Sequence, residues 1–167
     1  MAHPSLNTEP SNALYRVKRG LCGYISYLAA CEMNQAFSEY VLYEPILRVL
    51  MARGFTVRCE YVCPGIEHAV KGDKKRLDFF ATGANVTFAM EVKWAKSNTI
   101  NVEKDMKKLE AFCNATPDAM AFLCVFGRKT FIEALDMSKC SLKEKGKAVY
   151  ADLRRTKYGC RIFQVTI

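Results

Sequence analysis

The sequence of 167 residues predicts an α/β fold, a three-layer α/β/α domain with a central mixed sheet. Three observations lead to this class. Apolar residues recur at helical spacing over residues 35–53. Two apolar runs, residues 77–81 and 86–94, are joined by a short Gly- and Asn-containing turn and predict a hairpin. A second helical stretch, residues 102–114, leads into the continuous apolar run 119–126, which is typical of a strand buried on both faces.

The chain is expected to form a flexible N-terminal arm, residues 1–12, followed by a single domain of residues 13–167. The arm is polar and contains no apolar segment of the kind found in signal peptides. Ser11 or Asn12 could cap a helix over residues 13–33, which two glycines would interrupt. Half of the residues are apolar, so a chain of this length can bury a core of its own.

Several further boundaries follow from single residues. Pro45 predicts a kink or a helix restart within residues 35–53, and Gly54 is expected to end that helix. Residues 55–63 alternate between apolar and polar side chains and predict the first strand. Gly127 is expected to end the apolar run of residues 119–126. The remaining expectations are a short helix at 128–137, a lysine-rich loop at 138–147 and a last strand at 160–167, with 149–155 unassigned.

The two strands of the hairpin carry charges where apolar runs predict burial. Asp78 lies in the first strand, and Glu91 and Lys93 lie two residues apart in the second, so both point to one face. Burying a lone carboxylate costs several kcal/mol unless it is paired or binds a metal. A hard divalent cation held by oxygen ligands would explain carboxylates that converge on one side of a hairpin.

This pattern resembles the PD-(D/E)xK nuclease superfamily, whose members are restriction-endonuclease-like and include many restriction endonucleases and archaeal Holliday-junction resolvases. The family motif is an Asp on one strand and (Asp/Glu)-x-Lys on the next, which Asp78 and Glu91-Val92-Lys93 match. Leu77 stands where the family has its proline, a position that often varies. The resemblance covers residues 39–127.

The resemblance implies a Mg²⁺-dependent or Mn²⁺-dependent nuclease that hydrolyses phosphodiester bonds, with DNA as the expected nucleic acid. Asp78 and Glu91 would bind one or two metal ions, with the carbonyl of Val92 as a further oxygen ligand. Lys93 would orient the attacking water, help to deprotonate it, or stabilise the pentacovalent state. Which of these roles the amine takes depends on its pKa, and the sequence leaves that open.

A glutamate on the helix before the first strand often completes the metal site in this superfamily. Glu39 shares the core-facing stripe of the expected helix, whereas Glu44 falls on a different side but lies closer to Gly54. We favour Glu39 as a catalytic residue and metal ligand and keep Glu44 as the alternative. A surface carboxylate is the non-functional interpretation of either residue.

The basic residues suggest where a polyanion would bind. The formal net charge of +8 favours such a partner without proving one. Another basic cluster, Arg16, Lys18 and Arg19, fits either a solvated helix face or a phosphate contact. Similar alternatives apply to the five candidate nucleic-acid contacts beside the hairpin, which are Lys74, Lys75, Arg76, Lys104 and Lys108.

Two alternatives to an active nuclease stay open. The first is a protein with the nuclease fold that binds nucleic acid or a protein partner without cutting. The second is a regulatory or inhibitor protein whose basic surface binds an acidic partner. A homodimer is also open, because many relatives act as dimers. The eight cysteines form no Cys-x-x-Cys pair and are expected to be free thiols in a reducing cytoplasm, with a zinc site of Cys59, Cys63 and His68 as a minor alternative. No stretch is long enough for a membrane span, so a membrane partner is not expected.

Overall fold

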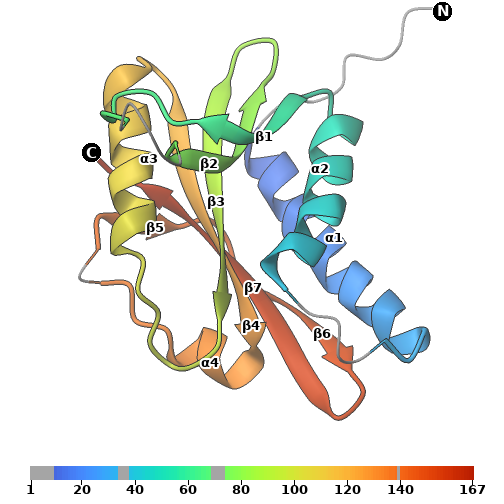
Figure 1. Cartoon of the computed structure of the whole chain (residues 1–167). Helices are drawn as coiled ribbons and strands as arrows, with labels where there is room; N and C mark the ends of the chain where they lie inside the picture. The colour runs from blue at the N-terminus through green and yellow to red at the C-terminus, as the bar shows by residue number, and fades with distance from the viewer. Residues whose placement is uncertain (1–9, 34–37, 69–73, 139) are drawn as a thin grey trace, which may run out of the picture.

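A computed structural model describes residues 10–33, 38–68, 74–138 and 140–167. It shows an α/β protein with one curled, seven-stranded mixed sheet and helices packed on both of its faces (Figure 1). The α/β class and the mixed sheet predicted from the sequence are therefore confirmed. Within the described residues, no helix is long and apolar enough to cross a membrane.

The bounds of the elements are as follows. The helices are α1 (Pro10–Ala30), the 3₁₀ helix η1 (Glu39–Leu42), α2 (Tyr43–Ala52), α3 (Glu103–Ala115) and α4 (Lys129–Ala134). The strands are β1 (Thr56–Val62), β2 (Arg76–Thr82), β3 (Thr87–Ala95), β4 (Met120–Arg128), β5 (Leu142–Glu144), β6 (Val149–Leu153) and β7 (Thr156–Val165).

The strand order in the sheet is β1-β2-β3-β4-β7-β5, and β6 pairs with the first half of β7. The predicted hairpin is confirmed, since β2 and β3 pair antiparallel from Thr82↔Thr87 to Phe79↔Met90. Strands β3 and β4 are parallel, and α3 makes the crossover between them. The remaining pairs are antiparallel.

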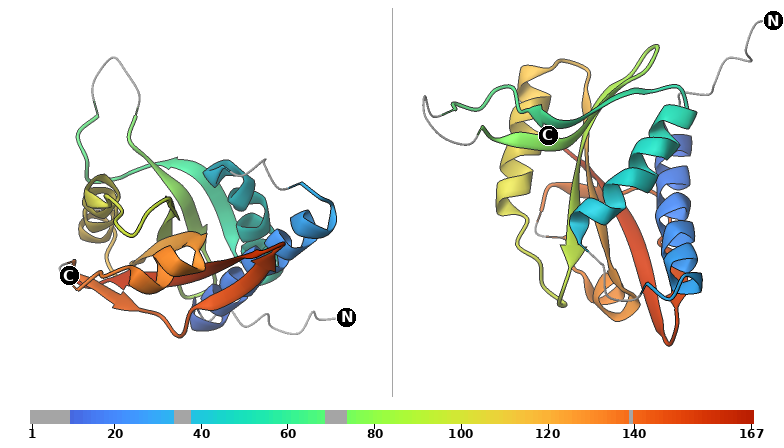
Figure 2. Two further views of the ribbon diagram at one scale, coloured as in Figure 1. Left: turned by 90° about the horizontal axis from the view of Figure 1, so that it is seen from below. Right: turned by 45° about the vertical axis from the view of Figure 1, so that its right-hand side comes forward.

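The sheet divides the apolar interior into two clusters. Helices α1 and α2 cover one face, and α3 and α4 cover the other, as the right-hand view of Figure 2 shows for α1, α2 and α3. Along β3, Met90 and Val92 pack toward α1 and α2, and Ala89 packs toward α3. Because side chains alternate along a strand, Glu91 and Lys93 point to the α3 side.

The N-terminal helix starts earlier than the sequence suggested. Residues 10–12, expected in the flexible arm, form the first turn of α1, where Pro10 occupies a position that proline tolerates. Residues 1–9 lie outside the described residues. Gly20 does not interrupt the helix, since α1 runs from Pro10 to Ala30. A Cβ atom at Gly20 would lie 2.8 Å from Val49 Cγ2. This glycine instead allows α1 and α2 to pack closely.

The single helix predicted over residues 35–53 is wrong in part. Within the described residues it consists of η1 and α2, which meet at Leu42 and Tyr43, and residues 34–37 lie outside them. Pro45 lies in the first turn of α2, where its missing N–H group is not needed for an intrahelical hydrogen bond. The proline therefore accompanies a helix restart, one of the two outcomes expected.

The C-terminal third contains more strand than predicted. Strand β4 continues through Gly127, where a Cβ atom would lie only 2.6 Å from the Ala95 carbonyl oxygen. That glycine allows β3 and β4 to approach each other and does not end the strand. The expected loop contains β5, the unassigned residues form β6, and β7 begins at Thr156 rather than Cys160. Residue 139 lies outside the described residues.

Candidate active site

Asp78 lies where β2 and β3 stop pairing. One residue beyond the last pair of the ladder, Asp78 Oδ2 accepts a hydrogen bond of 2.7 Å from the Val92 N–H group. The hydroxyl group of Tyr43 in α2 donates a hydrogen bond to the same carboxylate. Burial raises the pKa of Asp78, although the hydrogen bonds from Tyr43 and Val92 oppose this shift. The carboxylate is thus held in place between the two strands.

Glu91 is the most buried charged residue of the site, with 1% of its surface exposed. Its Oε2 atom lies 2.5 Å from Lys108 Nζ, while Oε1 is buried and has no hydrogen-bond partner among the described residues. Burial and the nearby Asp78 charge raise the pKa of Glu91 to about 8, against the opposing effect of Lys108. A second cation beside Oε1 would therefore stabilise the ionised carboxylate.

Lys93 forms an ion pair of 2.8 Å with Asp105 Oδ2 from α3. Burial lowers the pKa of Lys93, but the hydrogen bond and charge of Asp105, together with the charges of Glu39 and Glu91, raise it by more. The net shift is upward, so Lys93 is an ammonium ion at neutral pH. This charge state favours electrostatic stabilisation over proton abstraction.

The two ion pairs form because α3 runs antiparallel to β3. Residues three apart on a helix are separated by about 4.5 Å along its axis. Alternate residues of a strand are separated by about 6.6 Å. These spacings are similar, so two residues of α3 can each reach one residue of β3. Because the helix and the strand run in opposite directions, Asp105 pairs with Lys93 and Lys108 pairs with Glu91. Lys108 Nζ also contacts the Arg76 carbonyl oxygen at 2.9 Å, which connects α3 to β2.

The structure brings Glu39 to β3 and leaves Glu44 outside. Glu39 Oε1 accepts a hydrogen bond of 2.8 Å from the Trp94 N–H group, and its charge acts on the pKa of Lys93. Glu44 is exposed and pairs with Arg48 one turn further along α2. Of the two glutamates considered from the sequence, only Glu39 contacts the strand that carries Glu91 and Lys93.

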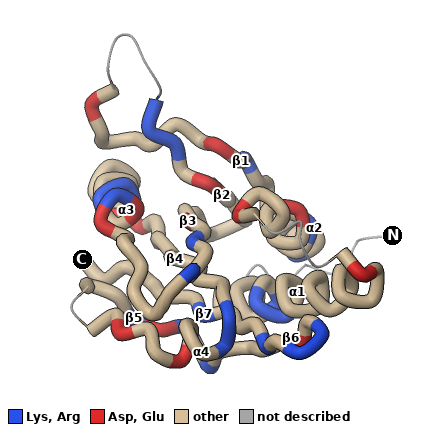
Figure 3. Tube along the Cα trace, turned by 60° about the horizontal axis from the view of Figure 1, so that its bottom comes forward, with Lys and Arg blue, Asp and Glu red and all other residues tan. Residues whose placement is uncertain are grey.

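A basic pocket of about 550 Å³ opens beside these ion pairs. Figure 3 shows α3, with its basic and acidic residues, beside β2. Lys108 was predicted to contact nucleic acid, but its ammonium group forms an ion pair with Glu91 instead. Lys74 is not among the lining residues, which are Ile66, Lys75, Arg76, Lys104, Asp105, Lys107 and Lys108.

Three residues near Asp78 and Lys93 were not assigned to the site from the sequence. The sequence did not predict Asp105 and Tyr43 as site residues, because their contacts depend on how α3 and α2 pack on the sheet. Glu60 lies between the Cys59↔Phe79 and Tyr61↔Leu77 pairs of β1 and β2, next to Asp78. It has the left-handed φ of 52°, and its charge contributes to the raised pKa of Asp78. A non-glycine residue in this conformation marks local backbone strain.

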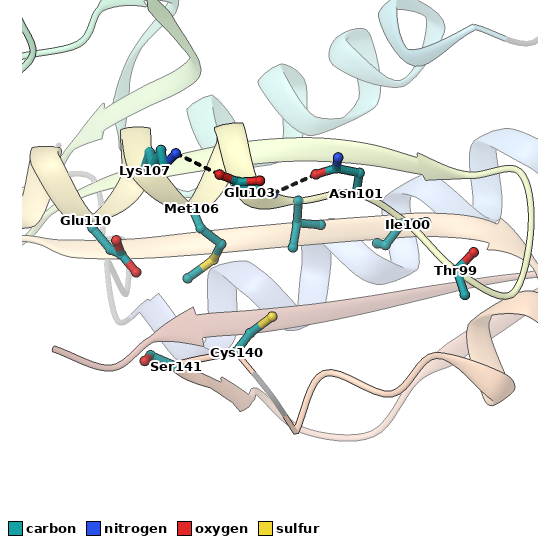
Figure 4. Close-up of a pocket in the computed structure, with 10 residues that line it drawn as sticks. Thr99, Ile100, Asn101, Glu103, Met106, Lys107, Glu110, Cys140 and Ser141 are labelled. Carbon is teal, nitrogen blue, oxygen red and sulfur yellow. Dashed lines mark hydrogen bonds and ion pairs between the residues drawn. The ribbon is translucent and has the colours of Figure 1, made fainter.

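Other candidate regions are less suited to catalysis. A larger pocket of about 830 Å³ lies on another side of α3, where Asn101 accepts a hydrogen bond from the Glu103 N–H group (Figure 4). The zinc alternative finds no support, since His68 Nε2 contacts the Cys63 carbonyl oxygen. Over residues 10–33, 38–68, 74–138 and 140–167, no group of three or more Asp, Glu, His or Cys side chains is arranged to hold a metal.

Comparisons with known proteins add nothing to this assignment. No protein-family model matches the chain, and searches of curated proteins and of solved structures found no match.

Proposed function

We propose that the protein is a Mg²⁺-dependent nuclease of the PD-(D/E)xK type that hydrolyses phosphodiester bonds of DNA. The observation that supports this most is that the half-buried Asp78 and the buried Glu91 lie close enough for their charges to interact, at the point where β2 and β3 stop pairing, with Lys93 two residues beyond Glu91 on β3. The helices on both faces of a mixed sheet support the three-layer, restriction-endonuclease-like architecture that belongs to this proposal.

The donor atoms suit a hard divalent cation. Glu91 Oε1 is buried without a hydrogen-bond partner in the described part of the chain, as expected for a ligand atom. Asp78 and the Val92 carbonyl would supply further oxygens, and Mg²⁺ and Mn²⁺ prefer such ligands. Mg²⁺ usually keeps several waters, so two carboxylates can suffice. The ion would lower the pKa of a bound water and offset negative charge on the phosphate.

The other residues have distinct roles in this mechanism. Lys93, held as an ammonium ion by Asp105, stabilises the negative charge that develops on the phosphate and orients the attacking water. Tyr43 and the Val92 N–H group fix the Asp78 carboxylate. Glu39 binds the backbone at Trp94 and keeps its negative charge close to Lys93.

The basic pocket supports nucleic acid as the substrate. Lys75, Arg76, Lys104 and Lys107 line it together with Asp105 and Lys108 of the ion pairs. Cations in this position can bind backbone phosphates on either side of the scissile bond.

A binding module without activity is the second candidate. It is favoured by the two ion pairs Lys93–Asp105 and Lys108–Glu91, which neutralise both members of the Glu-x-Lys motif without a metal. Metal binding separates the two functions, because a module that only binds nucleic acid has no need of it.

The test is incubation of plasmid and of single-stranded DNA with the purified protein in EDTA, Mg²⁺ or Mn²⁺. Glu91→Ala and Lys93→Ala are expected to abolish metal-dependent cutting. Glu44→Gln, a control at the exposed glutamate of α2, is expected to cut like the wild-type protein. Absence of cutting by every form, with no Mn²⁺-induced shift in melting temperature, would reject the nuclease and leave the binding module.

A further inference from the structure

A second basic groove lies between α1 and α2, apart from the candidate active site. It has a volume of about 530 Å³. Arg16 and Arg19 reach it from α1, and Arg53 reaches it from the end of α2. Gly20 and Val49 lie at a close contact of the two helices, because a Cβ atom at Gly20 would lie 2.8 Å from Val49 Cγ2. None of its lining residues is acidic, and none belongs to the site around Glu91.

The basic cluster noted in the sequence has two parts with different roles. Lys18 is buried, and its ammonium group donates hydrogen bonds to the carbonyl oxygens of Lys145 at 2.8 Å and Lys147 at 2.6 Å. That lysine stabilises the fold and is not a surface contact. Arg16 and Arg19 of the same helix are exposed and line the groove.

The charges of Arg16 and Arg19 are not neutralised by the protein in its described part. Neither residue forms an ion pair there. Helix α1 contains no Asp or Glu in its 21 residues. The Arg19 guanidinium lies over the Tyr15 ring at 5.9 Å and contacts the Tyr15 hydroxyl at 3.4 Å, so an aromatic residue orients it and leaves its charge uncompensated.

The side chains favour a phosphate-bearing ligand. Guanidinium groups present planar pairs of donors that match phosphate oxygens, and they bind phosphate more specifically than a general positive surface does. One turn beyond Gly20, Tyr24 stacks with Tyr27 at a centroid separation of 6.2 Å, and Tyr27 is 61% exposed. Arginines that bind phosphates beside aromatic rings that stack on bases are typical of surfaces for nucleic-acid strands.

We infer that the α1–α2 groove binds the backbone phosphates of a nucleic-acid strand. This inference deepens the proposed function, since it rests on nucleic acid as the partner and adds a contact surface outside the catalytic centre. A substrate that reaches both the groove and the basic pocket beside α3 is bound at two separate places. The groove therefore contributes to binding affinity and not to the chemical step.

Equilibrium binding of a short fluorescent DNA, measured in EDTA over a range of salt concentrations, tests the inference. The full-length double variant Arg16→Ala/Arg19→Ala is expected to bind about tenfold more weakly than the wild-type protein. The slope of log affinity against log salt should become shallower by about one for each lost phosphate contact. The melting temperature of the variant should be unchanged, because both side chains are exposed.

The matched control is Lys143→Ala/Arg155→Ala, which removes the same net charge from exposed positions at β5 and at the turn before β7. Equal affinities of the two double variants would overturn the inference. Competition by polyglutamate as strong as competition by unlabelled DNA would also overturn it, because the groove would then bind any polyanion. Since the measurement needs no cutting, failure of the nuclease proposal would appear separately, in the metal-dependent cleavage assay.

Discussion

Asp105 is the residue that most directly determines the charge of Lys93. Their ion pair has side-chain exposures of 11% for Asp105 and 29% for Lys93, so solvent screens it less than a surface pair. A carboxylate at this distance also fixes where the ammonium group points. Asp105 is therefore a positioning residue for Lys93, although it lies outside the Asp…Glu-x-Lys motif.

A double-mutant cycle can measure this pair. Asp105→Asn and Lys93→Met should show a coupling energy on the order of 1–2 kcal/mol in urea unfolding, because each single variant leaves a partly buried charge without its partner. The exposed pair Glu103–Lys107 on the same helix is the control and should show a much smaller coupling energy. Equal coupling energies for the two pairs would contradict the positioning role.

Glu91 predicts a pH dependence of stability in metal-free buffer. Burial and the Asp78 charge raise its pKa from 4.5 to about 8 in the folded state, so folding disfavours the ionised form. The stability that the neutral carboxyl group contributes is present below pH 4.5 and is lost as the pH rises to about 8. Glu91→Gln cannot ionise and avoids this loss.

The measurement is the melting temperature of Glu91→Gln minus that of the wild-type protein, in EDTA. The difference should increase as the pH rises through this window. Glu44→Gln, at the exposed glutamate of α2, is the control that removes a carboxylate outside the site. A flat profile for Glu91→Gln would show that Glu91 has an ordinary pKa in the fold.

At the scale of elements, helix α3 provides the ammonium group, that of Lys108, which pairs with the Glu91 carboxylate when no metal is bound. Lys108 Nζ lies between Glu91 Oε2 at 2.5 Å and the Arg76 carbonyl oxygen at 2.9 Å. A divalent cation on the same carboxylate would compete with that ammonium group. Metal affinity should therefore depend on a helix residue that is not itself a ligand.

Lys108→Met tests this competition. Without metal, the variant should be less stable than the wild-type protein, because Glu91 loses its partner. With saturating Mn²⁺, its melting temperature should rise by more than that of the wild-type protein. Lys107→Met, one residue away on the exposed side of α3, should respond like the wild-type protein. A smaller Mn²⁺ shift in Lys108→Met would contradict the competition.

The parallel strands β3 and β4 depend on Gly127. A Cβ atom at this position would lie 2.6 Å from the Ala95 carbonyl oxygen and 2.9 Å from Ala95 Cβ. Gly127→Ala should lower the free energy of unfolding by about 1–3 kcal/mol, because the backbones must move apart. Gly23→Ala is the control, since a Cβ there meets nothing within 4 Å. That substitution in α1 should stabilise the protein by about 0.5–1 kcal/mol, and urea unfolding measures both.

At the scale of the whole molecule, the sequence predicted those parts of the fold that neighbouring residues determine. The β2–β3 hairpin follows from two apolar runs and the turn residues between them, and its charges identified Asp78, Glu91 and Lys93 as candidates. Contacts between distant elements could not be derived in this way. Tyr43 and Asp105 reach the site because α2 and α3 pack in particular registers on the sheet. Periodicity gives the face of a helix but not its position along a strand.

The same limit explains the boundaries that were missed. Glycine suggested an end to β4 at Gly127, but the close approach of β3 requires a residue without a side chain there. Strand β5 has three mostly exposed residues, and β6 has only five residues, of which Ala151 and Leu153 are buried. Both pair with β7, which lies later in the chain. Segments this short contain little local signal, because the pairing with β7 stabilises them.

The buried ammonium group of Lys18 joins parts of the chain that are synthesised far apart in time. Its acceptors, the carbonyls of Lys145 and Lys147, follow it by 127 and 129 residues, and the apolar face of α1 packs against residues of β6 and β7. During translation, α1 leaves the ribosome long before these partners exist. The burial of α1 is thus completed late, and the part of its apolar face that packs on β6 and β7 stays open to chaperones until those strands emerge.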